Sequence, residues 1–162
     1  MTNREILKIA MEQSAKDLSA DAGDFEKSEN VIVLSRESAC ARRYLKLPFS
    51  CQLVSYGNNI VASVSPEFYG ITEKYINSYP AEHCFETPHL HVLNEALMAK
   101  GQKICFMAEY FLPDIPSLHA LECAYETHAL TQGDFCDLYL PQWSNALCKQ
   151  RRHLDVLGVG AY

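Results

Sequence analysis

Two short apolar runs, residues 51–56 and 60–64, are separated only by Gly57, Asn58 and Asn59. Glycine and asparagine adopt positive φ more readily than other residues, so this separation is typical of a β-hairpin. A strand is also expected at residues 31–34, a short apolar run bounded by polar residues. The pattern therefore predicts a small sheet in the first part of the chain.

Three helices are expected around this sheet. Thr2 and Glu5 have the spacing of a capping box, which predicts a helix over residues 3–18. Ser65-Pro66 and Thr87-Pro88 each place a capping residue before a proline, a pattern typical of a helix start. The second helix is expected to end at Pro80 and the third at Lys100-Gly101.

Residues 104–112 are the most apolar segment of the chain. An apolar run of this length with no polar alternation predicts a central strand that is buried on both faces. It completes the order helix, strand, hairpin, two helices and strand. Residues 1–117 are therefore expected to form an α/β domain.

Pro113 and Pro116 mark the boundary with a second part, residues 118–162. The expected elements there are a strand, two helices and a final apolar strand, and they occupy residues 125–130, 131–140, 142–152 and 156–162. The final strand is expected to lack a partner in this chain, so the partner would be a missing segment or a second copy. The predicted fold class is α+β, with mixed α/β elements.

Charge and hydropathy exclude several classes of function. The chain has 14 Lys and Arg against 20 Asp and Glu, a formal net charge of −6, which argues against a general nucleic-acid or membrane-surface binder. No apolar run approaches the roughly 18 residues that cross a bilayer, and the first residues are too polar for a signal peptide. The 7 cysteines are widely spaced and odd in number, which disfavours a disulfide framework. A cytoplasmic protein is expected.

The second part resembles the start of a GCN5-related N-acetyltransferase (GNAT) fold. The resemblance rests on the strand Tyr125-Glu126-Thr127-His128-Ala129-Leu130, the following Trp143-Ser144-Asn145-Ala146-Leu147, and the glycine-containing strand that ends at Tyr162. It covers residues 118–162, and residues 1–117 would be an extra N-terminal domain of a bacterial member. The resemblance implies a first β-α-α-β of the acyltransferase fold.

The resemblance also implies transfer of an acetyl group from acetyl-CoA to an amine acceptor. The family holds the cofactor pyrophosphate with a Gln/Arg-x-x-Gly-x-Gly/Ala loop and the helix that follows it. Asp155, Gly158 and Gly160 have the glycine spacing, but the aspartate would repel phosphate and no helix can follow. These glycines are expected to be strand residues, and no cofactor-binding residue is assigned to this chain, which by itself is expected to be inactive.

Candidate substrate-binding residues follow from the resemblance, because the segment between the first two helices would line the acceptor side of the cleft. These residues are Tyr139, Trp143, Ser144 and Asn145. A catalytic candidate comes from the residues themselves: Glu109 is a carboxylate within an apolar segment, where it needs a partner or acts as a base facing substrate. A solvent-exposed position near Pro113 is the simpler alternative for Glu109.

The densest polar chemistry lies in residues 82–91. His83, Cys84, His89 and His91 are candidate metal ligands suited to zinc, although their spacing is poor. Cys84 beside His83 is also a candidate nucleophile pair, whereas a helix-entry loop explains the same residues without chemistry. Arg42-Arg43 and the basic residues 149–152 are expected to be solvated or to form internal ion pairs rather than to bind phosphate.

Two functions therefore remain from the sequence. The first is the N-terminal part of a GNAT-type acetyltransferase, which takes a small-molecule or other amine acceptor. The second is a stand-alone ligand-binding or protein-interaction module, with a homodimer formed through the last strand. A small metal-dependent enzyme built on residues 83–91 ranks below both.

Overall fold

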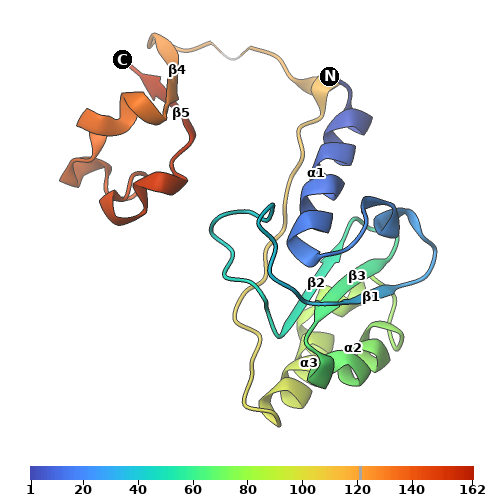
Figure 1. The fold of residues 1–162 in the computed structure, drawn as a ribbon. Coiled ribbons are helices and arrows are strands. Elements are labelled where there is room, and N and C mark those ends of the chain that lie inside the picture. The colour runs from blue at the N-terminus through green and yellow to red at the C-terminus, as the bar shows by residue number, and fades with distance from the viewer. Residues whose placement is uncertain (121) are drawn as a thin grey trace. The chain divides into compact units, whose positions relative to one another are not determined.

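The computed structural model describes residues 1–120 and 122–162. The chain forms two compact units, Met1–Ser117 and Leu118–Tyr162, and each is described by itself. Helices and strands occur together in a mixed α+β chain (Figure 1). Within the described part of the chain, no helix has the length and apolar character needed to span a membrane.

The first unit is built on a three-stranded sheet of β1 (Val31–Leu34), β2 (Cys51–Ser55) and β3 (Ile60–Val64). The strand order is β1-β3-β2, with β1 parallel and β2 antiparallel to β3. The predicted hairpin is confirmed, and Gly57 in its turn has φ +97°. The predicted strand at residues 31–34 is confirmed as well.

Helices cover both faces of this sheet, and alternate side chains of β3 pack against the helices on each face. Val61 packs on one face with residues of α1 (Asn3–Leu18), and all five β3 residues are buried. Ile60, Ala62 and Val64 point to the opposite face, which is covered by α2 (Tyr69–Ile76) and α3 (Thr87–Met98). The larger core on that face consists of Ile60, Ala62, Val64, Phe68, Tyr75, Ile76, Cys84, Leu93 and Leu97.

The ends of the helices follow their local sequence. The Thr2 hydroxyl accepts a hydrogen bond from the Glu5 backbone N–H at 3.3 Å, and the Glu5 carboxylate accepts one from the Thr2 backbone N–H at 2.6 Å, which confirms the capping box. The helix α3 is followed by Gly101 with φ +74°, as the sequence predicts.

The helix α2 is shorter than predicted, because it ends at Ile76 rather than near Pro80. The Asn77 side chain donates to the Glu73 carbonyl at 2.9 Å, and the Ser78 hydroxyl donates to the Lys74 carbonyl at 2.6 Å. These side chains satisfy carbonyl groups of the last turn and compete with further helical bonds.

The prediction of a central buried strand over residues 104–112 is wrong. This segment forms no regular element, and most of its residues are exposed. The central position in the sheet belongs to β3, whose two edges are already paired with β1 and β2. Apolar composition alone did not distinguish a strand inside the sheet from an apolar segment outside it.

The second unit contains β4 (Thr127–Thr131) and β5 (Leu157–Ala161), which pair antiparallel with Thr127 opposite Ala161. The expectation that the last strand has no partner in this chain is therefore wrong. The two predicted helices are short 3₁₀ turns instead, namely η5 (Gln132–Leu138), η6 (Pro141–Trp143) and η7 (Lys149–Leu154). The Asp134 carboxylate accepts the Thr131 backbone N–H at 2.7 Å, so the predicted cap is present although the α-helix is not.

Gly158 and Gly160 lie within β5, as the sequence predicts. A Cβ atom on Gly158 would stand 3.1 Å from a ring carbon of Phe135, the buried aromatic residue of this unit. A Cβ atom on Gly160 would stand 3.0 Å from a ring carbon of Tyr162. These glycines leave room for aromatic rings to pack on the strand.

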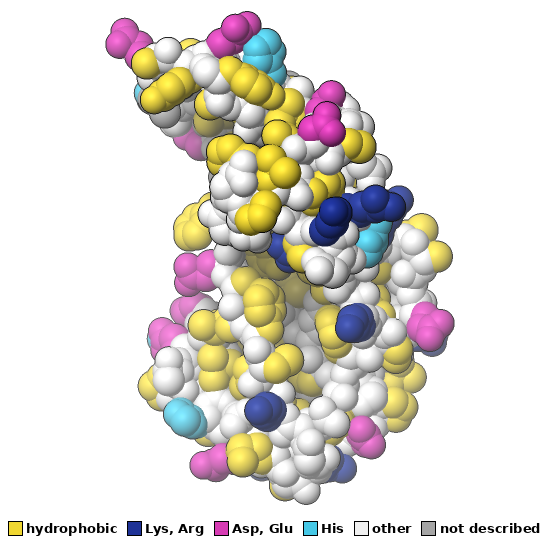
Figure 2. Space-filling view, turned by 90° about the vertical axis from the view of Figure 1, so that its left-hand side faces the viewer, with side chains coloured by type: hydrophobic (Ala, Val, Ile, Leu, Met, Phe, Trp, Pro, Cys, Tyr) yellow, Lys and Arg dark blue, Asp and Glu magenta, His cyan; other side chains and the backbone are white. Residues whose placement is uncertain are grey.

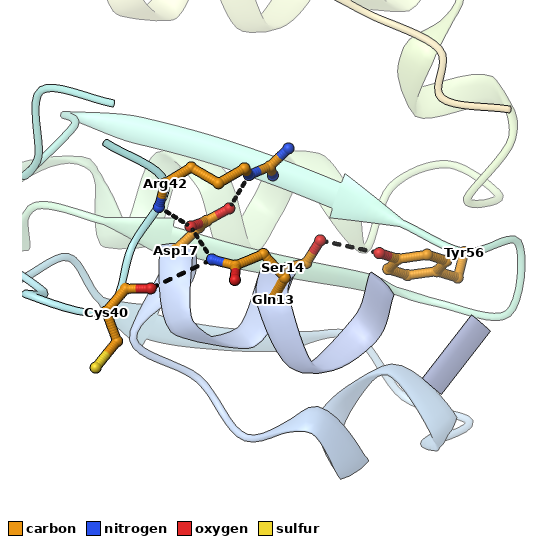
Figure 3. A network of polar contacts seen from close by, with 6 residues as sticks. All are labelled: Gln13, Ser14, Asp17, Cys40, Arg42 and Tyr56. Carbon is orange, nitrogen blue, oxygen red and sulfur yellow. Dashed lines mark hydrogen bonds and ion pairs between the residues drawn. The ribbon is translucent and has the colours of Figure 1, made fainter. Parts of the chain in front are cut away.

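The long loop between β1 and β2 is attached to α1 through the buried carboxylate of Asp17 (Figure 3). Asp17 accepts hydrogen bonds from the Arg42 backbone N–H at 2.8 Å, from Arg42 Nε at 2.5 Å and from Gln13 Nε2 at 3.0 Å. Burial alone would lower the pKa of the Arg42 guanidinium, but the hydrogen bond to Asp17 and its charge raise that pKa above the ordinary value. Arg42 thus forms an internal ion pair, one of the two alternatives expected for this residue.

Replacing Arg42 tests how much this attachment contributes. Arg42→Met leaves the buried Asp17 carboxylate without its counter-charge and is expected to lower the free energy of unfolding by about 2 kcal/mol. The exposed neighbour provides the control, since Arg43→Met should change stability by less than about 0.5 kcal/mol. Urea unfolding of both variants measures the difference, and equal stability of the two would contradict the role given to Asp17.

Candidate functional site

A pocket of about 220 Å³ lies among the 3₁₀ turns of the second unit. Its residues come from Pro141 of η6, from the start of η7 and from the connections on either side of η6. Two of the predicted acceptor-binding residues, Tyr139 and Ser144, belong to the lining. The full lining is Tyr139, Leu140, Pro141, Ser144, Leu147, Cys148, Lys149 and Gln150.

Backbone hydrogen bonds fix the two sides of this pocket. The Trp143 N–H donates to the Leu140 carbonyl at 3.0 Å, and the Leu147 N–H donates to the Trp143 carbonyl at 2.8 Å. Pro141 begins η6, where its fixed φ suits a first helical position. The consecutive turns bring Leu140 and Leu147 to the same pocket although seven positions separate them.

Tyr139 is held at the pocket by Asp155, which directly follows η7. The phenol of Tyr139 donates a hydrogen bond of 2.8 Å to Asp155 Oδ2. Reduced contact with water and this bond raise the pKa of the Tyr139 phenol above its ordinary value, so the residue is neutral at physiological pH. Asp155 therefore makes a structural contact with Tyr139. Its spacing with Gly158 and Gly160 resembles that of a cofactor loop, but its carboxylate is used in this contact.

The lining combines an apolar wall with a few polar groups. Leu140, Pro141 and Leu147 supply the wall, while Ser144 and Gln150 can donate or accept hydrogen bonds and Lys149 carries a positive charge. The lining contains no carboxylate and no histidine. An apolar wall with a few polar groups is a composition that suits binding of a small molecule.

The other predicted site residues lie elsewhere. Trp143, which is 50% exposed, and Asn145 are on the surface and do not line the pocket. Glu109 is exposed on the segment 104–112 of the first unit. The burial that made Glu109 a candidate base is absent, which leaves the solvent-exposed alternative for this residue.

The structure brings His83 and His89 together around one carboxylate. Nδ1 of His83 lies 2.9 Å from Glu86 Oε2, and Nδ1 of His89 lies 3.8 Å from the same oxygen. The His89 ring also packs against the Tyr79 ring, with 4.3 Å between their centroids. This cluster links the loop before α3 to the first turn of that helix.

The predicted zinc site is not formed by these residues. Cys84 is buried on the core side, where its thiol lies 3.8 Å from the Tyr79 carbonyl oxygen. His91 is exposed on α3, two positions from His89 and therefore on a different side of the helix. In residues 1–120 and 122–162, no three His, Cys, Asp or Glu side chains are grouped so that they could hold a metal ion.

Several residues of the pocket were not predicted from the sequence. Leu147, Cys148, Lys149 and Gln150 line it because η7 turns back toward η6, and no periodic pattern marks that turn. The sequence places Asp155 only in the glycine spacing, and its bond to Tyr139 joins residues 16 positions apart. The sequence feature that could have indicated this pocket is Pro141, which separates the two predicted helices. A helix break at a proline brings the residues before and after it close together.

Alkylation of the cysteines tests the burial of Cys84. Burial raises the pKa of the Cys84 and Cys51 thiols, whereas Cys40, Cys105 and Cys136 are exposed. Iodoacetamide at neutral pH should therefore modify Cys84 at least about tenfold more slowly than Cys136, since the thiolate is the reactive form. Mass spectrometry of time points gives the rates, and equal rates would restore Cys84 as a candidate nucleophile.

Comparison with known proteins adds no assignment to this geometry. No protein-family model, curated protein or solved structure matches the chain. The support for a function therefore comes from the residues and their arrangement alone.

Proposed function

We propose that this chain is the N-terminal part of a GNAT-type acetyltransferase and that its second unit binds the amine acceptor. The observation that carries the proposal is the pocket of about 220 Å³ that contains Tyr139 and Ser144. Its position supports it too, since the resemblance implies that the segment between the first two helices lines the acceptor side, and Tyr139 and Ser144 lie where the two expected helices meet.

The pocket suits recognition of an acceptor more than the chemical step. In the acetyl transfer that the resemblance implies, the amine nitrogen forms a bond to the acetyl carbon, the carbon–sulfur bond breaks, and the amine loses a proton. Ser144 and Gln150 can hydrogen-bond the acceptor while Leu140 and Leu147 cover its apolar part. The lining contains no carboxylate and no histidine, and its titratable groups are Tyr139, Cys148 and Lys149.

The cofactor side of the reaction has no counterpart among these residues. The 162 residues contain no Gln/Arg-x-x-Gly-x-Gly/Ala sequence, and Gly158 and Gly160 belong to β5. An anion site of this kind needs backbone N–H groups at the start of a helix. The proposal therefore separates acceptor binding, which this chain would retain, from acetyl-CoA binding.

Titration with acetyl-CoA tests this separation. Isothermal calorimetry of the 162-residue chain is expected to give no stoichiometric binding tighter than roughly 1 mM. Coenzyme A without the acetyl group serves as a second ligand, because it carries the same pyrophosphate. Tight binding of either ligand would overturn the conclusion that these residues do not form the cofactor site.

Titration with amines tests acceptor binding. Spermidine, free lysine and kanamycin, added one at a time, sample primary amines of different size; at least one should shift the amide resonances of Ser144 and Leu147 in a ¹H–¹⁵N spectrum. Ser144→Trp fills the pocket and should weaken that binding at least roughly tenfold, because the side chain occupies the ligand volume.

A matched variant shows whether the effect belongs to the pocket. Ser28 is exposed and belongs to the first unit, so Ser28→Trp adds the same side chain outside the unit that holds the pocket and should leave amine binding unchanged. If no amine shifts the pocket resonances, or if Ser144→Trp binds as well as the unaltered chain, the acceptor site is not where we place it.

A further inference from the structure

An extended segment of the first unit, residues 104–112, is held at its ends and near its middle. At one end, the Ile104 N–H donates a hydrogen bond of 2.8 Å to Asn94 Oδ1 on α3. Just beyond the other end, the Ile115 N–H donates one of 2.8 Å to Asn3 Oδ1 on α1. The segment thus runs from the end of α3 to the beginning of α1 (Figure 1).

The middle of the segment rests on the loop that Asp17 attaches to α1. The guanidinium carbon of Arg42 lies 5.5 Å from the centroid of the Tyr110 ring and 5.7 Å from that of Tyr44. These contacts order the segment before any partner arrives. Ordering in advance lowers the entropic cost of binding along its length.

The segment exposes both apolar side chains and unpaired backbone groups. Phe106 is 73% exposed and Phe111 is 88% exposed, with Met107, Tyr110 and Leu112 also on the surface. Figure 2 shows hydrophobic side chains scattered over one face of the molecule, and the exposed residues of this segment are identified from their exposed fractions. Within the described part of the chain, residues 105–112 take part in no backbone–backbone hydrogen bond. An extended, apolar chain with free N–H and C=O groups is a template for a further β-strand.

The side chains of the segment are self-complementary about Ala108. In an antiparallel pair centred on this residue, Ile104 would face Leu112 of the second strand and Phe106 would face Tyr110. The small Ala108 side chain would face its own copy at the two-fold axis. Residues of similar character thus meet on one face, as cross-strand pairing favours.

Glu109 is the only charged residue among residues 104–112. Its position is compatible with an antiparallel pair centred on Ala108 and disfavours other alignments of the two segments. Glu109 would face Met107 of the second strand when the pair is centred on Ala108. An antiparallel pair centred on Glu109, or a parallel pair in register, would place the two Glu109 carboxylates opposite each other. Like charges in that position are destabilising, so the charge selects among the possible pairings.

We infer that residues 104–112 form a docking strand for a second copy of this chain, with the two segments pairing antiparallel about Ala108. The occupant is a second copy because the segment matches itself in side-chain character and in the placement of its charge. The segment pairs with none of the three strands of the chain's own sheet, whose order is β1-β3-β2. This association does not depend on acetyl transfer and differs from a dimer through β5.

Analytical ultracentrifugation of the full chain over a range of concentrations tests the inference. The unaltered chain is expected to show a monomer–dimer equilibrium. In the pair that we propose, the two Ala108 residues exchange both N–H···O=C hydrogen bonds, so Ala108→Pro removes an N–H that the central pair needs and should abolish the dimer. Circular dichroism and thermal unfolding should stay unchanged, since that N–H takes part in no backbone hydrogen bond within the described part of the chain.

Two variants at one position test the register. Met107→Lys places a cation opposite Glu109 in each of two symmetric pairs and should tighten the dimer roughly twofold to thirtyfold. Met107→Glu places two carboxylates there and should weaken it by a similar factor. A non-specific hydrophobic contact would be weakened by both variants, which would overturn the proposed pairing.

Two further outcomes would also overturn it. One is a chain that remains monomeric up to about 1 mM, where even weak specific association is visible. The other is a dimer that survives Ala108→Pro, which would place the interface elsewhere, for example at β5. The exposed Val92 of α3 gives the control for surface charge, because Val92→Lys should leave the dimerisation constant unchanged.

Discussion

The first unit depends on β3, which is paired on both edges and covered on both faces. Its alternating side chains define two cores: Val61 packs with α1, whereas Ile60, Ala62 and Val64 pack with α2 and α3. Because a strand can be hydrogen-bonded on two edges only, β3 leaves no interior position for a fourth apolar segment. Residues 104–112 pair with neither edge strand, β1 or β2, and their exposure provides the surface on which we base self-association.

The second unit is organised on a smaller scale. Gly158 and Gly160 of β5 leave space for the rings of Phe135 and Tyr162. These rings pack directly on the strand, and Phe135 is buried there. Three short 3₁₀ turns then connect the two strands and surround the pocket. The backbone of such turns changes direction often, so it can bring Tyr139, Ser144 and Lys149 to one cavity within a short stretch of chain.

Local patterns predicted those elements whose ends are set by neighbouring residues. The capping box of Thr2 and Glu5, the turn at Gly57 and the cap at Gly101 each depend on contacts within a few positions, and all three were found. The pattern of Thr131 and Asp134 also formed its cap, yet the element that followed was a 3₁₀ turn. A cap favours the start of a helix but does not decide its length or type.

The sequence by itself determined the mixed α+β character, the hairpin and the helices of the first unit, since these depend on periodicity and on turn residues. Of the four acceptor-binding candidates that came from the resemblance, Tyr139 and Ser144 line the pocket, whereas Trp143 and Asn145 do not. Only the tertiary structure decided that residues 104–112 lie outside the sheet, that Cys84 faces the core, and that Asp155 holds Tyr139. Each of these depends on contacts between distant parts of the chain, and local hydrophobicity carries no information about which positions in a sheet are already filled.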